Sequence, residues 1–145
     1  MSEPFMIRQR PTRLSAVTLL QAEGLPVEDL TEAHLDHFFY CGDDDAPSGL
    51  VGVELFGEQA LMRSLVVSSA VRSQGIGSAL VQHAEAYAAA HGVRAIYLLT
   101  TTADLFFEYR GYRAVDRTQA PSSIQLTREF AGLCPESSIV MLKQL

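Results

Sequence analysis

Residues 60–77 read ALMRSLVVSSAVRSQGIG, and the rest of the chain is organised around this stretch. It begins with an apolar run that predicts a buried strand ending at Val67. Segment 72–77, RSQGIG, then leads into an alanine-rich pattern that predicts a helix. A strand, a glycine loop and a helix in this order place backbone N–H groups at the positive end of a helix dipole. Because glycines let an anion approach the backbone and Arg72 adds a fixed positive charge, the stretch indicates a site for phosphate or pyrophosphate.

The glycine pair by itself leaves two interpretations open. Gly-x-Gly pairs also occur at ordinary strand-to-helix turns, where they bind nothing. The dinucleotide-binding fingerprint requires a third glycine at the position of Leu80, and the P-loop requires a Gly-Lys-Ser/Thr sequence that the chain lacks. What remains is Arg-x-x-Gly-x-Gly after a strand that ends Leu-Val-Val, which resembles the acetyl-CoA motif of the GNAT N-acetyltransferases.

A second motif supports this resemblance. Residues 103–112, ADLFFEYRGY, are similar to a pattern that GNAT proteins often show at this point, Ala-x-x-Phe-Tyr-x-x-x-Gly-Phe/Tyr. The matching residues are Ala103, Phe106, Gly111 and Tyr112. Together the two motifs cover roughly the middle third of the chain in the family's order and spacing, so a chance pairing is not expected.

The resemblance implies one GNAT domain over residues 1–145. Its fold class is α/β (α+β), with a mixed central sheet of about six to seven strands flanked by helices and splayed between strands 60–67 and 95–101. The hydrophobic patterns agree, because a strand, a helix and a strand between residues 60 and 101 predict two parallel strands with a right-handed crossover. Strands are expected at 6–9, 37–41, 50–56, 60–67, 94–101, 112–115 and 138–142, and helices at 13–23, 26–34, 77–91 and 103–110.

Acetyl-CoA is the co-substrate that the resemblance implies. In the family, the end of the central strand binds the pantetheine arm and the thioester carbonyl, and the glycine loop binds the pyrophosphate. The residues of this chain at those positions, with two aromatic residues of the second motif, are Leu65, Val66, Val67, Arg72, Ser73, Gln74, Gly75, Ile76, Gly77, Ser78, Phe106 and Tyr109.

Acetyl transfer to an amine needs a group that takes a proton from the amine, and four residues are candidates for the catalytic site. Glu54 lies mid-strand beside the central strand and is either the base or a solvent-facing strand residue. Arg63 is a charge within an apolar strand, costly to bury unless paired, so it pairs with Glu54 or binds a substrate carboxylate. Ser64 and Thr100 either supply hydroxyl groups at the splay or only satisfy local hydrogen bonds.

The chain departs from the family pattern at one position. The tyrosine that usually acts as general acid follows the motif phenylalanine directly, and here that position holds Phe107. Tyr109 is two residues on, roughly on the opposite side of a helix. The thiolate would therefore leave with a proton from water or from another donor such as Tyr97. An acyl-CoA-binding sensor without turnover stays open as an alternative function.

Sequence segments outside the two motifs resemble one subgroup of the GNAT family. Segments 123–130 and 133–138, with RSL at 63–65 and LTTT at 99–102, resemble those of bacterial arsenic-resistance N-acetyltransferases. Related enzymes acetylate amino-acid analogues such as phosphinothricin. The expected acceptor is thus the amine of a small molecule, with a protein acceptor as the less favoured alternative and a homodimer as an open option.

Composition excludes other classes of function. The 145 residues are 48% hydrophobic and 19% charged, which is typical of a soluble globular domain. A net charge of −6 gives no electrostatic support to nucleic-acid binding, and no apolar run reaches transmembrane length. The N-terminus shows no signal-peptide pattern, and Cys41 and Cys134 lack C-x-x-C spacing, so reduced thiols in the cytoplasm are expected. No metal site is expected, because His34 and His37 have no Cys/His cluster around them.

Overall fold

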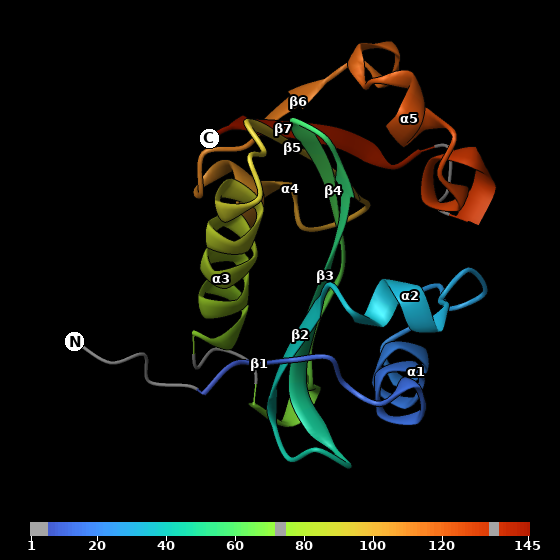
Figure 1. Ribbon diagram of the computed structural model, residues 1–145, viewed down its shortest axis with the longest axis vertical. Coiled ribbons are helices and arrows are strands. Elements are labelled where there is room, and N and C mark those ends of the chain that lie inside the picture. The colour runs from blue at the N-terminus through green and yellow to red at the C-terminus, as the bar shows by residue number, and fades with distance from the viewer. Residues whose placement is uncertain (1–5, 72–74, 134–136) are drawn as a thin grey trace. The chain divides into compact units, whose positions relative to one another are not determined.

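The computed structural model describes residues 6–71, 75–133 and 137–145 (Figure 1). Its strands are β1 (Arg8–Gln9), β2 (Phe38–Gly42), β3 (Pro47–Phe56), β4 (Gln59–Val67), β5 (Ala95–Thr100), β6 (Arg113–Val115) and β7 (Ile139–Gln144). Its helices are α1 (Arg13–Ala22), α2 (Glu32–Leu35), α3 (Ile76–Ala90), α4 (Asp104–Glu108) and α5 (Ser122–Gln125). Within the described ranges the strands form one sheet in the order β1-β2-β3-β4-β5-β7-β6, which confirms the mixed α/β fold class. None of these helices has the length and apolar character that a membrane crossing needs.

The chain divides into two compact units. The first is made of residues up to Glu54 together with Met62–Tyr87. The second is made of Leu55–Leu61 together with Ala88–Leu145. Strand β4 therefore begins in the second unit and continues in the first, and helix α3 runs from the first unit into the second.

In the first unit, the alternation of side chains along β2 builds two layers. Phe38 belongs to a buried core with Leu20 of α1 and Leu35 of α2. The ring of the next residue, Phe39, instead lies 4.8 Å from the ring of Tyr87 on α3. Because successive side chains of a strand point to opposite faces, α1 and α2 cover one face of this part of the sheet and α3 covers the other (Figure 1).

Close packing in the first unit depends on a glycine in β3. Gly52 lies opposite Phe38 in the antiparallel register of β2 and β3. A Cβ atom at Gly52 would lie 2.3 Å from the Phe38 ring, so the aromatic side chain occupies the space that any other residue would need. Helix α1 agrees with the helix predicted over 13–23, and Gly24 follows it with a φ of +78°. At its start the hydroxyl of Thr12 accepts from the backbone N–H of Ser15 over 3.2 Å, a cap that was not predicted from the sequence.

The second helix is shorter than the sequence predicts. Only Glu32–Leu35 is helical, with Thr31 as its N-cap, and residues 26–30 take a non-helical path. The prediction of a helix over 26–34 was therefore wrong for its first half. The physical reason is that both Asp29 and Leu30 of this segment are buried. Asp29 forms an ion pair with Arg63, and Leu30 packs in the apolar core. Tertiary contacts of these two residues override the local helical preference.

In the second unit, β5 pairs in parallel with the start of β4, Gln59–Leu61 against Ala95–Tyr97. This confirms the parallel strands predicted on either side of α3. The C-terminal strand β7 lies antiparallel to β5 and also to β6. Ile124 of α5 is fully buried in the core of this unit. The splay expected farther along β4 and β5 stays a prediction.

Candidate active site

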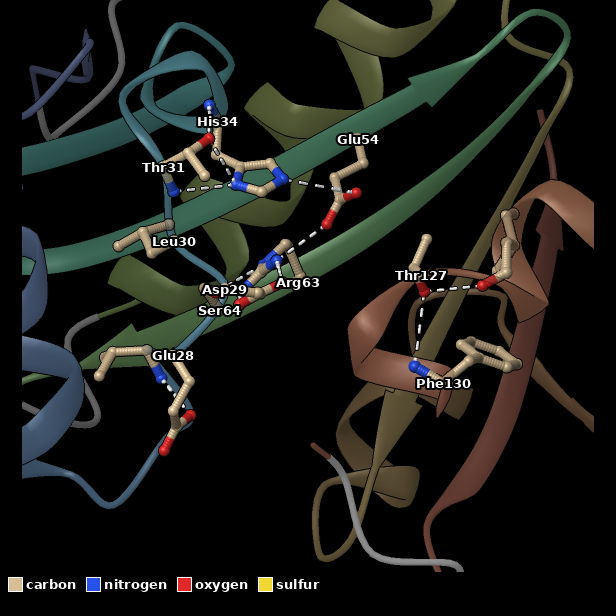
Figure 2. A network of polar contacts seen from close by, with 12 residues as sticks. Glu28, Asp29, Leu30, Thr31, His34, Glu54, Arg63, Ser64, Thr127 and Phe130 are labelled. Atoms are coloured by element: carbon tan, nitrogen blue, oxygen red, sulfur yellow. Dashed lines mark hydrogen bonds and ion pairs between the residues drawn. The ribbon is translucent and has the colours of Figure 1, made fainter. Parts of the chain in front are cut away.

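A buried arginine organises the polar residues of the first unit. Arg63 lies on β4, and its side chain is 0% exposed. Its Nη1 donates to Oδ2 of Asp29 over 2.5 Å and to Oε2 of Glu54 over 2.8 Å, and its Nη2 donates to Oδ1 of Asp29 over 2.8 Å (Figure 2). A buried charge requires partners of this kind. The geometry confirms the expected pairing of Arg63 with Glu54 and adds Asp29, which the sequence does not predict.

Asp29 joins the segment before α2 to strand β4. Both of its carboxylate oxygens accept from Arg63, which is the two-pronged geometry that favours arginine over lysine. Burial raises the pKa of Asp29, but the hydrogen bonds and positive charge of Arg63 outweigh burial, so the pKa lies below its ordinary value. Asp29 is therefore an anion held by its partner, and its role in the unit is to anchor the guanidinium.

Strand β4 is distorted at Ser64, directly after the arginine. Ser64 is buried and has a φ of +59°, a left-handed conformation that non-glycine residues rarely adopt. Its Oγ accepts from Nε of Arg63 over 3.1 Å. Met62, Arg63 and Ser64 are buried in succession, which agrees with a strand whose sheet is covered by helices on both faces. The structure thus brings Ser64 together with Arg63, and the hydrogen bond that its hydroxyl makes with this neighbour is local.

The fourth predicted catalytic residue lies in the second unit. Thr100 ends β5, and its Oγ1 accepts from the backbone N–H of Ala103 over 3.0 Å. This bond shapes the turn that leads into α4, which is the local role that the sequence left open. The catalytic roles of Thr100, Glu54, Arg63 and Ser64 stay predictions.

His34 also faces Glu54, although the sequence does not predict it as a catalytic residue. It stands in the N-terminal turn of α2, where its backbone N–H donates to the hydroxyl of Thr31 over 3.3 Å. Its Nε2 lies 3.8 Å from Oε1 of Glu54 (Figure 2). The signal that points to His34 is Thr-x-x-His, because the third position of a helix commonly closes a capping box.

Asp29, His34 and Glu54 offer ligand atoms that all lie within 4.8 Å of one another, a spacing that a metal ion would suit. Nη1 of Arg63, however, contacts both carboxylates and occupies the place between them. A second cation would have to displace this buried guanidinium. The positive charge that pairs with the carboxylates of Asp29 and Glu54 is therefore the guanidinium of Arg63.

The predicted cofactor residues fall at the end of β4 and the start of α3. Val66 is buried in the core of the first unit, while Leu65 and Val67 are half-buried. Gly75 is exposed with a φ of +83°, and α3 begins at the next residue, so the strand, loop and helix follow the predicted order. Arg72, Ser73 and Gln74 lie outside the described residues.

Helix α4 carries the remaining predicted residues. Phe107, at the position where the resemblance implies a tyrosine, is buried with its ring 5.1 Å from that of Phe106 and 5.4 Å from that of Tyr112. The guanidinium of Arg110 lies 3.6 Å from the ring centre of Phe106. Tyr109 follows the helix and is 90% exposed. The aromatic cluster of α4 thus buries Phe107 and leaves Tyr109 in solvent.

The other phenol considered for the leaving thiolate has a partner within the second unit. The Tyr97 hydroxyl donates to the backbone carbonyl of Gln119 over 3.5 Å. Tyr97 is also buried in the core of that unit. Its role as a proton donor stays a prediction.

Comparisons with known proteins agree with this architecture. The sequence model of the acetyltransferase (GNAT) family matches residues 7–112. An uncharacterized N-acetyltransferase of Chlorobaculum tepidum is 31% identical over 99 residues, which are 68% of this chain and 63% of that relative. The chain thus spans less than two thirds of the curated relative that it matches.

Solved structures share the fold at low identity. N-acetylglutamate synthase of Neisseria gonorrhoeae, solved with coenzyme A and N-acetyl-glutamate, has a TM-score of 0.82 at 19% identity, covering 100% of this chain and 36% of that one. A Mycobacterium tuberculosis protein solved with CoA has a TM-score of 0.75 at 15% identity, covering 97% of this chain and 99% of that one. At these identities the likeness shows the fold alone.

Proposed function

Because the chain belongs to the acetyltransferase (GNAT) family, we propose that it transfers an acetyl group from acetyl-CoA to the amine of a small molecule. The observation that carries the proposal is the family match over residues 7–112, which includes the strand, loop and helix of the predicted cofactor site and the Glu54–Arg63 pair. Relatives of the same fold that were solved with coenzyme A support acetyl-CoA as the co-substrate.

In the proposed reaction Glu54 is the base. The amine must lose a proton before its nitrogen can attack the thioester carbon, and a positioned carboxylate accepts that proton directly or through one water. The new C–N bond forms as the C–S bond breaks, and the CoA thiolate takes a proton from water. Glu54 suits the role for two reasons. Its side chain is 14% exposed, so a substrate can reach it, and its ion pair with Arg63 holds it in place. Arg63 itself is fully buried, so its proposed role is to hold Glu54 rather than to bind a substrate carboxylate.

The proposed cofactor site combines backbone groups with the positive end of a helix. Leu65, Val66 and Val67 would bind the pantetheine arm through their main chain, and the turn before α3 would bind the pyrophosphate. The helix dipole of α3 favours an anion at this end. Among the residues that the structure describes, other than its chain neighbours, none has an atom within 4 Å of a Cβ placed at Gly75, which supports an open approach.

The proposed acceptor is an amino-acid analogue, either arsenical or phosphinothricin-like. The resemblance of residues 123–130 and 133–138 to arsenic-resistance N-acetyltransferases supports this class. The fold relative from Neisseria, which was solved with N-acetyl-glutamate, is consistent with an acceptor of amino-acid type.

One observation favours a second function, an acyl-CoA-binding sensor without turnover. Phe107 replaces the tyrosine that the family usually has as its general acid, and it is buried between Phe106 and Tyr112. A buried phenylalanine has no proton for a leaving thiolate. If water does not replace this donor, the protein binds acetyl-CoA and releases no thiol.

Calorimetric titration with acetyl-CoA, followed by thiol release in the presence of amino-acid analogues including phosphinothricin, tests both functions. Binding with turnover supports the transferase, binding without turnover of any amine supports the sensor, and no binding refutes both. Gly75→Glu should abolish binding, because it places a carboxylate against the pyrophosphate. The matched control is Gly57→Glu, since Gly57 also has a positive φ and open space around it but lies in the turn between β3 and β4.

A further inference from the structure

Helix α2 brings a histidine to the candidate base. We propose that His34 is a positioning residue that orients the carboxylate of Glu54 for proton transfer, through an imidazole whose N–H is directed by the capping box of α2. The proposal rests on the proposed function, because it assigns a partner to the base of that reaction. It depends on three observations, namely the hydrogen bonds of the capping box, the contact between imidazole and carboxylate, and the exposure of the two side chains.

The capping box determines which ring nitrogen of His34 carries a hydrogen. The backbone N–H of Thr31 donates to Nδ1 of His34 over 3.1 Å, so Nδ1 is an acceptor and bears no hydrogen. In a neutral imidazole the hydrogen is then on Nε2. Capping boxes usually have Glu or Gln at this third position, whose side chain ends at the cap. A histidine closes the same box and presents a second nitrogen on its far side.

That second nitrogen faces the candidate base. Nε2 of His34 lies 3.8 Å from Oε1 of Glu54, while Nη1 of Arg63 donates to Oε2 over 2.8 Å (Figure 2). Each carboxylate oxygen therefore faces its own nitrogen; the hydrogen bond from Arg63 holds Oε2, and the proposed role of His34 is to hold Oε1. The 3.8 Å separation is longer than a direct hydrogen bond, so the proposed role requires this contact to tighten when substrate binds, as catalytic contacts commonly do, or to run through one water.

Exposure shows on which side of the network a substrate can act. The side chains of Arg63 and Asp29 are 0% and 5% exposed, whereas those of Glu54 and His34 are 14% and 25% exposed. The imidazole and the carboxylate thus form the accessible side of the network. Two carboxylates against one guanidinium leave one negative charge, and a positively charged amine is attracted to it. His34 is therefore placed where it can hold Glu54 without blocking access to it.

A purely structural role for His34 is the alternative, and His34→Gln separates the two. Glutamine is a usual residue at the third position of a capping box, so it can take over the cap that histidine closes here. Helix α2 should therefore keep its stability. Its amide cannot cap Thr31 and also reach Glu54. If His34 positions the base, kcat/KM for the amine falls at least about tenfold, since a small displacement of a reacting group can cost about a hundredfold. The KM for acetyl-CoA and the melting temperature should stay unchanged.

A control variant and a rescue measurement complete the experiment. Thr12→Ala removes the cap of α1, so it should lower the melting temperature by about 2–4 °C and leave kcat/KM unchanged. For His34→Ala, added imidazole should restore part of the lost rate, because a ring that is 25% exposed leaves a site open to solvent. A wild-type rate in His34→Gln would overturn the positioning role while leaving the transferase intact. Absence of turnover in the wild-type protein would overturn the proposed function itself.

Discussion

Replacing Asp29 by alanine tests the buried ion pair on which the first unit depends. Asp29→Ala removes the carboxylate that both Nη atoms of Arg63 contact, while Glu54 remains bound to Nη1. The arginine side chain is 0% exposed, so water cannot replace the lost partner without opening the unit. Removing one member of a buried pair costs about 3–5 kcal/mol. Because Glu54 stays in place, we expect the lower end, about 3 kcal/mol, or roughly 6–12 °C in melting temperature.

The assay is urea unfolding followed by circular dichroism, with the wild type, Asp29→Ala and a matched control. The control is Asp36→Ala, which removes a carboxylate from an exposed ion pair with Arg10, whose side chains are 48% and 58% exposed. Exposed pairs contribute about 1 kcal/mol or less, and salt screens them. At high salt the loss in Asp36→Ala should vanish and the loss in Asp29→Ala should persist. An Asp29→Ala loss that is no larger than that of the control, or that salt removes, would refute the reasoning.

The same pair predicts how stability depends on pH. The pKa of Asp29 in the folded chain is lower than its ordinary value of 3.8, so the folded state holds this carboxylate in its charged form more strongly than the unfolded state does. Its contribution to the free energy of unfolding is fully present above about pH 5 and is lost as the pH falls below 3.8 through the folded pKa. The difference between wild type and Asp29→Ala should therefore shrink in acid. A difference that stays constant from pH 7 to pH 3 would contradict this.

Two further predictions concern packing and thiol chemistry. Gly52→Ala should destabilise the protein by about 1–3 kcal/mol, because its Cβ would lie 2.3 Å from the Phe38 ring. Adding Phe38→Leu to this variant should recover part of the lost stability. If the two losses measured by urea unfolding are simply additive, the two residues do not interact in this way. Burial raises the pKa of the Cys41 thiol, so with Cys134 replaced by serine, Ellman's reagent at pH 8 should react at least about tenfold more slowly with the folded than with the unfolded chain.

Local patterns were enough to predict the strand, turn and helix on which the proposed cofactor site lies. The strand that ends at Val67, the turn at Gly75 and the helix from Ile76 occur in the predicted order because each follows from residues close in sequence. Hydrophobic periodicity determines which segments are strand and helix, and a glycine allows the positive φ at the turn. The fold class follows for the same reason, since a strand, a helix and a strand of these lengths favour a parallel crossover.

The polar network of Asp29, Glu54 and Arg63 could not be predicted in full from local patterns, because only the tertiary structure brings its members together. Asp29 and Arg63 are 34 residues apart, and the segment that contains Asp29 reads locally as helix. The sequence does show that Arg63 needs a partner, because a charge in an apolar strand is costly, and it offers Glu54 on the neighbouring strand. It has no signal for the left-handed Ser64, since no glycine marks the position.

The same limit applies to His34. Its capping position is readable from Thr31, but its approach to Glu54 depends on how α2 packs on β3. Spacing along the chain determines which backbone conformations form, whereas long-range burial of charge determines which side chains meet. Patterns local in the sequence were therefore sufficient for the fold class and the family, and the cofactor loop stays a prediction from such a pattern. The partners of the candidate base depend on long-range packing, which only the folded chain brings about.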